Sequence, residues 1–137
     1  MNTKHSFQKA LSLVAFLMLL VATTAQAKRV VERPYFLGSN NHKLEIERVT
    51  LDKKATIIDV KIYQASGDVG IDSHAYIMAN GVKYDYIGSK QLPKGVFVKV
   101  PECGYVAATL RFKPMPETTK EFDFRETADN SGWNIYG

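Results

Sequence analysis

The amino-acid sequence predicts an antiparallel all-β fold, a β-sandwich of about seven to nine strands preceded by a signal-peptide helix. Several short segments alternate apolar and polar residues with period two, as strands with one buried face do. Clusters of Asn, Gly, Pro and Asp separate these segments, and no helical periodicity follows residue 27. Short strands with turns between them are typical of a sandwich.

Length and composition indicate one ordinary globular domain. The chain has 137 residues, of which 45% are hydrophobic and 23% charged, with a formal net charge of +4. Without Lys4 and Lys9, which lie in the leader described next, 16 of the 18 basic residues remain against 14 acidic ones, a net charge of +2. This weak, evenly spread charge predicts no nucleic-acid partner.

Residues 1–27 have the pattern of a secretory signal peptide. Lys4 and Lys9 form a basic start, residues 10–21 are mostly apolar, and Ala25-Gln26-Ala27 matches an A-x-A cleavage site. A membrane anchor is the alternative, but the apolar run is shorter than the roughly 20 residues that span a bilayer. No cysteine lies near the cleavage site for lipid attachment. We therefore expect a periplasmic or extracellular protein that is not a lipoprotein and has no membrane span after cleavage, with residues 28–137 as its single domain.

The first half of that domain predicts an edge strand and a hairpin. Residues 30–36 are extended and contain Pro34, which suits an edge or a strand end. The apolar phase of Leu44–Leu51 shifts by one residue near Glu47-Arg48, which predicts a β-bulge. A turn at residues 52–54 then leads to strict alternation in Thr56–Tyr63.

Asn80-Gly81 is the clearest turn in the chain. This dipeptide favours a two-residue type I′ hairpin. It predicts that Ala79 pairs with Val82, Ile77 with Tyr84, and Ala75 with Tyr86, all six on one apolar face. On the other face Met78 would meet Lys83, and Tyr76 would meet Asp85.

The second half predicts three more strand regions. The first is residues 96–100, with Val96, Val98 and Val100 in phase. Residues 103–126 then hold two alternating strands, the first burying Val106, Ala108, Leu110 and Phe112, and the second carrying Phe122 and Phe124. Pro114 and Pro116 exclude a helix between them, and we expect the two strands to pair with each other in an antiparallel sheet with one wet face. Trp133 and Ile135 mark a short final strand.

Candidate chemistry is sparse, and no cofactor or metal is predicted. Cys103 is the single cysteine, so it predicts a free thiol or an intermolecular bond; the alternative is a small residue before a strand. His42 and His74 lack partners at metal-ligand spacing, and Asp68 and Asp72 do not match a calcium loop.

Two carboxylate pairs are interpreted as solvated strand faces. No hydrolase, P-loop or zinc-protease motif occurs, so we expect no enzyme. These pairs are Glu45/Glu47 and Glu121/Asp123.

Four aromatic residues are predicted on faces opposite the core. Outward aromatic rings can stack on a sugar or fill a partner's pocket. The alternative is that a second sheet or neighbouring side chains cover them. The four are Tyr63, Tyr76, Tyr105 and Phe97.

The domain resembles the N-terminal immunoglobulin-like β-sandwich module of certain secreted thioredoxin-family proteins, thiol–disulfide oxidoreductases of Gram-negative anaerobes. The resemblance covers nearly all of residues 28–137. It implies an immunoglobulin-like antiparallel β-sandwich. The residues that carry it are Pro34-Tyr35-Phe36, Leu44-Glu45-Ile46-Glu47-Arg48-Val49, Ala79-Asn80-Gly81-Val82-Lys83-Tyr84, Phe112-Lys113-Pro114-Met115-Pro116, Phe122-Asp123-Phe124 with Glu126, and Trp133-Asn134-Ile135-Tyr136-Gly137.

The chain departs from that family in one respect. Those proteins continue into a thioredoxin domain with a C-x-x-C motif, which this sequence lacks, so the redox activity is not carried over. A standalone module and a shortened gene both stay open. We expect a non-catalytic interaction or accessory module, with a thioredoxin-fold protein as a possible partner. A partner could add a strand at an exposed edge, such as the segment around Pro34 or the one at Trp133. The alternative is a carbohydrate- or cell-surface-binding module that uses the outward aromatics on a glycan.

Overall fold

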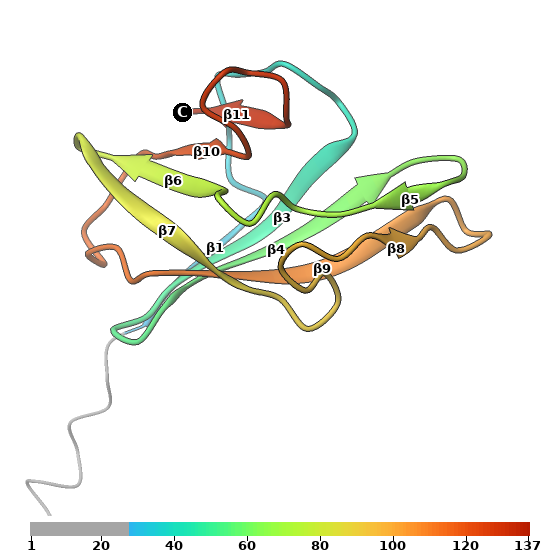
Figure 1. The fold of residues 1–137 in the computed structure, drawn as a ribbon. Helices are drawn as coiled ribbons and strands as arrows, with labels where there is room; N and C mark the ends of the chain where they lie inside the picture. Colours follow the sequence, from blue (N-terminus) through green and yellow to red (C-terminus); the bar gives the residue numbers. More distant parts are fainter. Residues whose placement is uncertain (1–27) are drawn as a thin grey trace, which may run out of the picture.

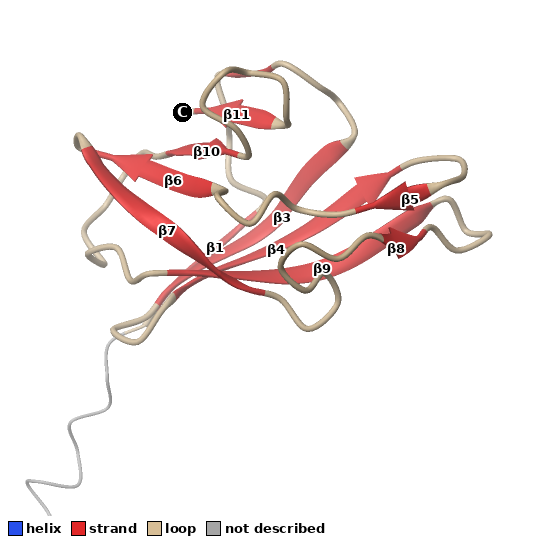
Figure 2. Ribbon diagram, in the orientation of Figure 1, coloured by secondary structure: helices blue, strands red, loops and turns tan. Residues whose placement is uncertain are grey.

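The computed structural model describes residues 28–137, so the predicted signal peptide lies outside the described residues. These residues form strands and loops with no helix (Figure 2). Nine of the strands form one antiparallel sheet in the order β1-β3-β4-β9-β7-β6-β10-β11-β2, and β5 pairs with β8. The predicted all-β antiparallel fold is therefore confirmed. The strands are β1 (Arg29–Glu32), β2 (Gly38–Ser39), β3 (Leu44–Leu51), β4 (Thr56–Tyr63), β5 (Asp68–Val69), β6 (Tyr76–Ala79), β7 (Val82–Gly88), β8 (Val98–Lys99), β9 (Tyr105–Phe112), β10 (Asp123–Arg125) and β11 (Asn134–Tyr136).

The sheet curls on itself and makes two facing layers, as in a sandwich. Strands β1, β3, β4 and β9 lie in one layer, and β6, β10 and β11 lie across from them (Figure 1). Strand β7 joins the layers, because its first half pairs with β6 and its end pairs with β9. The ladder between β7 and β9 is irregular between Tyr86 and Gly88, as expected where a strand changes layer.

Alternating side chains fill the space between the layers. In β4 the buried residues are Thr56, Ile58, Val60 and Ile62, and in β9 they are Val106, Ala108, Leu110 and Phe112, as predicted. The predicted bulge in β3 is confirmed, since its register against β4 shifts between Ile46 and Arg48. The shift moves Val49 and Leu51 back onto the inner face, which keeps both ends of β3 in the core.

The Asn80-Gly81 hairpin has the predicted register, from Ala79 opposite Val82 to Tyr76 opposite Asp85. Both turn residues have positive φ, 50° and 75°, as a type I′ turn requires. One detail of the prediction is wrong: Val82 is 49% exposed. Val82 directly follows the turn, and only Ala79 opposite it is buried at this end of the hairpin.

Two other predictions are corrected. The strands on either side of Pro114 and Pro116 do not pair with each other, because the proline loop carries the chain from one layer to the other; β9 lies between β4 and β7, and β10 lies between β6 and β11. The segment 96–100 forms a strand only at Val98–Lys99. Val96 is exposed there, since it belongs to the loop before β8 and not to the core.

Candidate interaction surfaces

The outer face of the β3-β4-β9 layer brings two of the four predicted aromatics together. The rings of Tyr63 and Tyr105 lie 5.7 Å apart at 49°. The Tyr63 hydroxyl donates to Glu45 Oε2 at 2.9 Å, and this hydrogen bond raises the pKa of Tyr63. Lys61 Nζ lies 2.6 Å from Glu47 Oε1 and 5.5 Å from the centre of the Tyr105 ring. The polar groups around this aromatic pair thus already hold partners within the chain.

A shallow hollow of about 450 Å³ lies on the same face, over the small side chain of Ala107. Its charges also pair within the chain: Arg48 lies 2.7 Å from Glu32 and 3.7 Å from Asp59. The Thr109 hydroxyl donates to Asp59 at 2.6 Å. This face is a solvated one on which charges of both signs neutralise each other.

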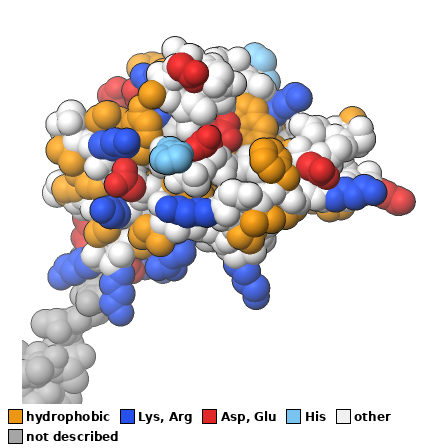
Figure 3. Space-filling model, viewed as in Figure 1, with side chains coloured by type: hydrophobic (Ala, Val, Ile, Leu, Met, Phe, Trp, Pro, Cys, Tyr) orange, Lys and Arg blue, Asp and Glu red, His pale blue; other side chains and the backbone are white. Residues whose placement is uncertain are grey.

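The other two predicted aromatics lie elsewhere. Tyr76 is half-buried on β6, and Lys83 Nζ lies 4.5 Å from the centre of its ring, which is a cation–π contact across the hairpin. Phe97 is 72% exposed in the loop before β8. Hydrophobic, basic and acidic side chains are interspersed on the face of the molecule shown in Figure 3.

The remaining chemistry-bearing residues do not gather into one centre. Cys103 is exposed in the turn before β9, with its Sγ 3.5 Å from the Tyr105 carbonyl oxygen. His74 lies in a loop, with Nδ1 3.3 Å from Asp72 Oδ1. Within residues 28–137 no group of three or more His, Cys, Asp or Glu side chains is placed to hold a metal ion. Over the same residues, no helix has the length and apolar character needed to cross a membrane.

A surface that the sequence marked only as an exposed edge around Pro34 lies where the two edges of the curled sheet approach. Residues 34–37 connect β1 at one end of the strand order to β2 at the other. Arg33 N–H donates to the Glu47 carbonyl at 2.7 Å, and Leu37 N–H donates to the Tyr136 carbonyl at 2.8 Å. Both ends of the connection are therefore fixed, and the segment bridges the opening between the edges.

This bridging segment exposes three large apolar side chains in succession. Tyr35 is 83% exposed, Phe36 51% and Leu37 72%. Isolated apolar residues on a surface are ordinary, but a contiguous exposed run usually marks a contact surface. The sequence signal was Pro34, which predicted an edge to which a partner could add a strand but did not reveal this apolar run. The other predicted edge, around Trp133, is wrong, because β11 lies between β10 and β2.

A cleft of about 350 Å³ lies beside the bridging segment. Its apolar side is formed by Val31, Leu51 and Met115. Arg29 closes one part of it by donating through Nη1 to the Thr119 carbonyl at 2.7 Å. The Thr119 hydroxyl is buried and, among the described residues, has no hydrogen-bond partner, which is uncommon for a buried polar atom.

Strand β1 also has a free edge next to this cleft. Among the described residues β1 pairs only with β3. An edge strand carries unpaired backbone donors and acceptors that accept an additional strand. The bridging segment, the cleft and the edge of β1 together form what we call the seam surface.

Comparisons with known proteins add no assignment. A scan against protein-family models, a search of curated proteins and a search of solved structures each found no match. The resemblance to the module of secreted thioredoxin-family proteins therefore stays a prediction.

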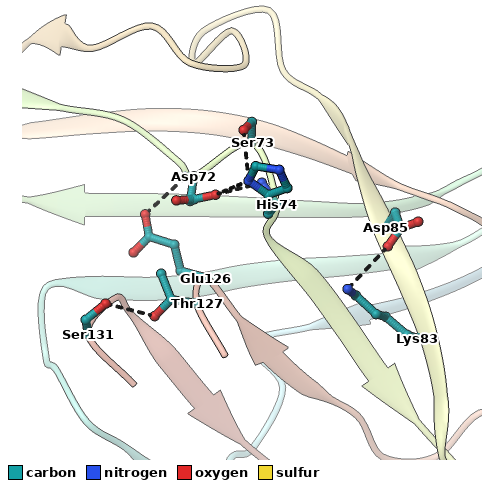
Figure 4. Close-up of polar contacts among 8 residues, drawn as sticks. All are labelled: Asp72, Ser73, His74, Lys83, Asp85, Glu126, Thr127 and Ser131. Carbon is teal, nitrogen blue, oxygen red and sulfur yellow. Dashed lines mark hydrogen bonds and ion pairs between the residues drawn. The ribbon is translucent and has the colours of Figure 1, made fainter. Parts of the chain in front are cut away.

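A second cleft, of about 370 Å³, lies among three loops and is lined by Asp72, Phe97 and Glu126. Figure 4 shows the Glu126 side chain directed toward Asp72. Glu126 Oε2 accepts from Trp133 N–H at 2.7 Å, and Oε1 accepts from Asp72 N–H at 3.2 Å. Burial raises the pKa of Glu126, an effect that these two hydrogen bonds partly oppose.

This shift predicts a pH dependence for Glu126. Because its pKa is higher in the folded than in the unfolded chain, the folded state binds the proton more tightly, and stability falls as pH rises from the ordinary value of 4.5 through the raised one. Glu126→Gln removes this titration. We expect the unfolding free energy of the Gln variant, relative to wild type, to improve between about pH 4 and about pH 7 in urea titrations. A difference in unfolding free energy between the two proteins that stays constant over that pH range would contradict the raised pKa of Glu126.

Proposed function

We propose that the chain is an exported, non-catalytic interaction module that binds a protein partner through the seam surface. The observation that carries the proposal is the exposure of three consecutive large apolar side chains, Tyr35, Phe36 and Leu37, on a segment pinned at both ends. A fixed apolar surface loses little conformational entropy on binding, so its burial contributes to affinity with a small opposing cost.

The geometry of the seam supports a partner that supplies an extended segment. The free edge of β1 offers backbone hydrogen bonds, and the adjoining cleft offers an apolar wall at Val31, Leu51 and Met115 for alternate side chains of an added strand. The resemblance to modules that precede a thioredoxin domain makes an exported thioredoxin-fold protein the first partner to test. The proposal includes no nucleic-acid partner, because the net charge without the leader is small.

The double variant Tyr35→Ser/Leu37→Ser tests this proposal. Both side chains project from the fold, so the free energy of unfolding should change by no more than about 0.5 kcal/mol for each substitution. The affinity for a purified thioredoxin-fold partner, measured by calorimetry, should fall about tenfold or more, since removed apolar contacts of this size are worth over 1 kcal/mol.

Val82→Ser is the matched control, because Val82 is also an exposed apolar residue but lies at the tip of the β6–β7 hairpin. The affinity of the Val82→Ser variant for the thioredoxin-fold partner should equal that of wild type. Equal loss in the control and the double variant, or wild-type affinity in the double variant, would contradict the assignment of the seam.

A further inference from the structure

The cleft that contains Phe97 and Glu126 is a separate feature from the seam. Three loops meet there: the one after β5, the one before β8, and the one between β10 and β11. Loops that converge on a rigid scaffold are common places for binding sites. The volume of about 370 Å³ is in the range of small-molecule sites.

We propose that this cleft binds a neutral saccharide, with Phe97 as the stacking platform and the carboxylates of Glu126 and Asp72 as hydroxyl acceptors. A pyranose ring has an apolar C–H face and a rim of hydroxyl donors. A site for it therefore needs an exposed aromatic ring next to acceptors that keep free lone pairs.

The aromatic ring is exposed, on a loop that packs closely against Gly70. Phe97 is 72% exposed, and its loop lies directly against Gly70. A Cβ built on Gly70 would lie 3.0 Å from the Val96 carbonyl oxygen and 3.3 Å from Phe97 Cδ1. The absence of a side chain at Gly70 therefore lets the loop of Phe97 approach closely and places the ring at this cleft.

The acceptors are positioned by backbone hydrogen bonds. Each oxygen of the Glu126 carboxylate accepts one backbone N–H, from Trp133 or from Asp72. A carboxylate has about four lone-pair sites, so each oxygen keeps capacity for a ligand hydroxyl. In Asp72, Oδ1 accepts the His74 N–H at 2.7 Å, and no hydrogen bond to Oδ2 is formed among the described residues.

The loop that carries the acceptor is cross-linked by its own hydrogen bonds. Asn134 is fully buried, and its Oδ1 accepts the Glu126 N–H at 3.1 Å while its Nδ2 donates to Asn130 Oδ1 at 2.9 Å. Thr127 Oγ1 accepts the Gly132 N–H at 2.8 Å. Satisfied networks of this kind hold a loop in one arrangement, and here the network positions Glu126 within the loop between β10 and β11.

The charge around the cleft disfavours an anionic ligand and suits one rich in hydrogen-bond donors. Among the described residues, neither carboxylate has a lysine or arginine within 4.0 Å, and the one ion-pair partner is His74, with its side chain 93% exposed. An anionic sugar would be repelled. A cationic peptide is the competing ligand class, and Phe97 alone does not form the multi-ring cage in which aromatics hold cations best.

The test is an array of neutral oligosaccharides built from hexoses and N-acetylhexosamines, probed with the purified chain of residues 28–137 in its folded form. Any sugar bound is then titrated by NMR. We expect Phe97→Ala to weaken its binding at least tenfold and Glu126→Gln to weaken it severalfold. Thermal unfolding of both variants is measured in parallel, because Phe97→Ala at an exposed position should leave the fold intact.

Control variants separate this site from other surfaces. Tyr63→Ala and the seam variant Tyr35→Ser/Leu37→Ser should keep wild-type sugar binding, so failure of this proposal and failure of the seam proposal are distinguishable. No sugar bound by the wild-type chain, unchanged binding in Phe97→Ala, loss of binding in Tyr63→Ala, or binding of a lysine-rich peptide in place of sugars would each overturn the proposal.

Discussion

Phe112→Ala is expected to lower the free energy of unfolding by about 3–5 kcal/mol, the largest effect of any substitution considered for this fold. Phe112 is fully buried at the end of β9. Its ring lies 5.3 Å from that of Tyr86 on β7 and 6.0 Å, edge to face, from that of Phe124 on β10. Removing it opens a cavity between the two layers and breaks two aromatic contacts at once.

Urea unfolding followed by tryptophan fluorescence measures this loss, since Trp133 is the single tryptophan. Phe112→Leu keeps most of the volume and should lose much less stability. Phe97→Ala, at an exposed position, should change the free energy of unfolding by no more than about 0.5 kcal/mol. A loss below about 1 kcal/mol in Phe112→Ala would show that the layers are not joined through this ring.

Thr56→Val should destabilise the fold by about 1–3 kcal/mol, although the two side chains have nearly the same shape. Thr56 is fully buried at the start of β4, and its Oγ1 accepts the Met115 N–H at 2.9 Å. Valine at position 56 leaves the buried Met115 N–H without an acceptor. The free-energy cost of removing that N–H from water is then not offset by a hydrogen bond. Met115 belongs to the proline loop, so this bond anchors the crossing between the layers.

Thr50→Val is the matched control on the neighbouring strand. Thr50 is also buried, but its hydroxyl makes no hydrogen bond among the described residues. Its replacement should be neutral or slightly stabilising by the same reasoning. Equal effects of the two substitutions in thermal unfolding would mean that the hydroxyl of Thr56 contributes nothing specific.

The sequence predicted local structure well because the decisive interactions there are short in range. Asn80-Gly81 specifies a turn with two residues at positive φ, and that turn fixes the register of β6 and β7. The phase shift near Glu47 and Arg48 revealed the bulge, since a slip of one residue would otherwise turn the inner face of β3 outward.

The order of strands across the sheet could not be read in the same way. The partner of a strand depends on contacts distant in sequence, such as Phe124 opposite Ile77, and alternation records only which face is buried. For this reason β9 and β10 were wrongly expected to pair. Nothing in the local sequence predicts the bend of β7 between the layers. In the structure, the bend coincides with the irregular ladder between β7 and β9 at Tyr86 and Gly88.

The surfaces proposed to bind were predicted only in part. Phe97 was identified as an outward aromatic, but its place beside Glu126 depends on the meeting of three loops. The exposure of Tyr35, Phe36 and Leu37 was missed, because consecutive apolar residues around a proline resemble a buried strand end. Only the approach of the two sheet edges leaves them without a covering layer.

If the seam is a contact surface, a side chain at its centre must lie against a partner. A photo-reactive phenylalanine analogue placed at position 36, in cells that export the chain, tests this directly; the same analogue at position 82 is the control. We predict one discrete adduct with an exported protein from position 36 and none from position 82. No adduct from position 36, or the same adducts from both positions, would contradict the claim.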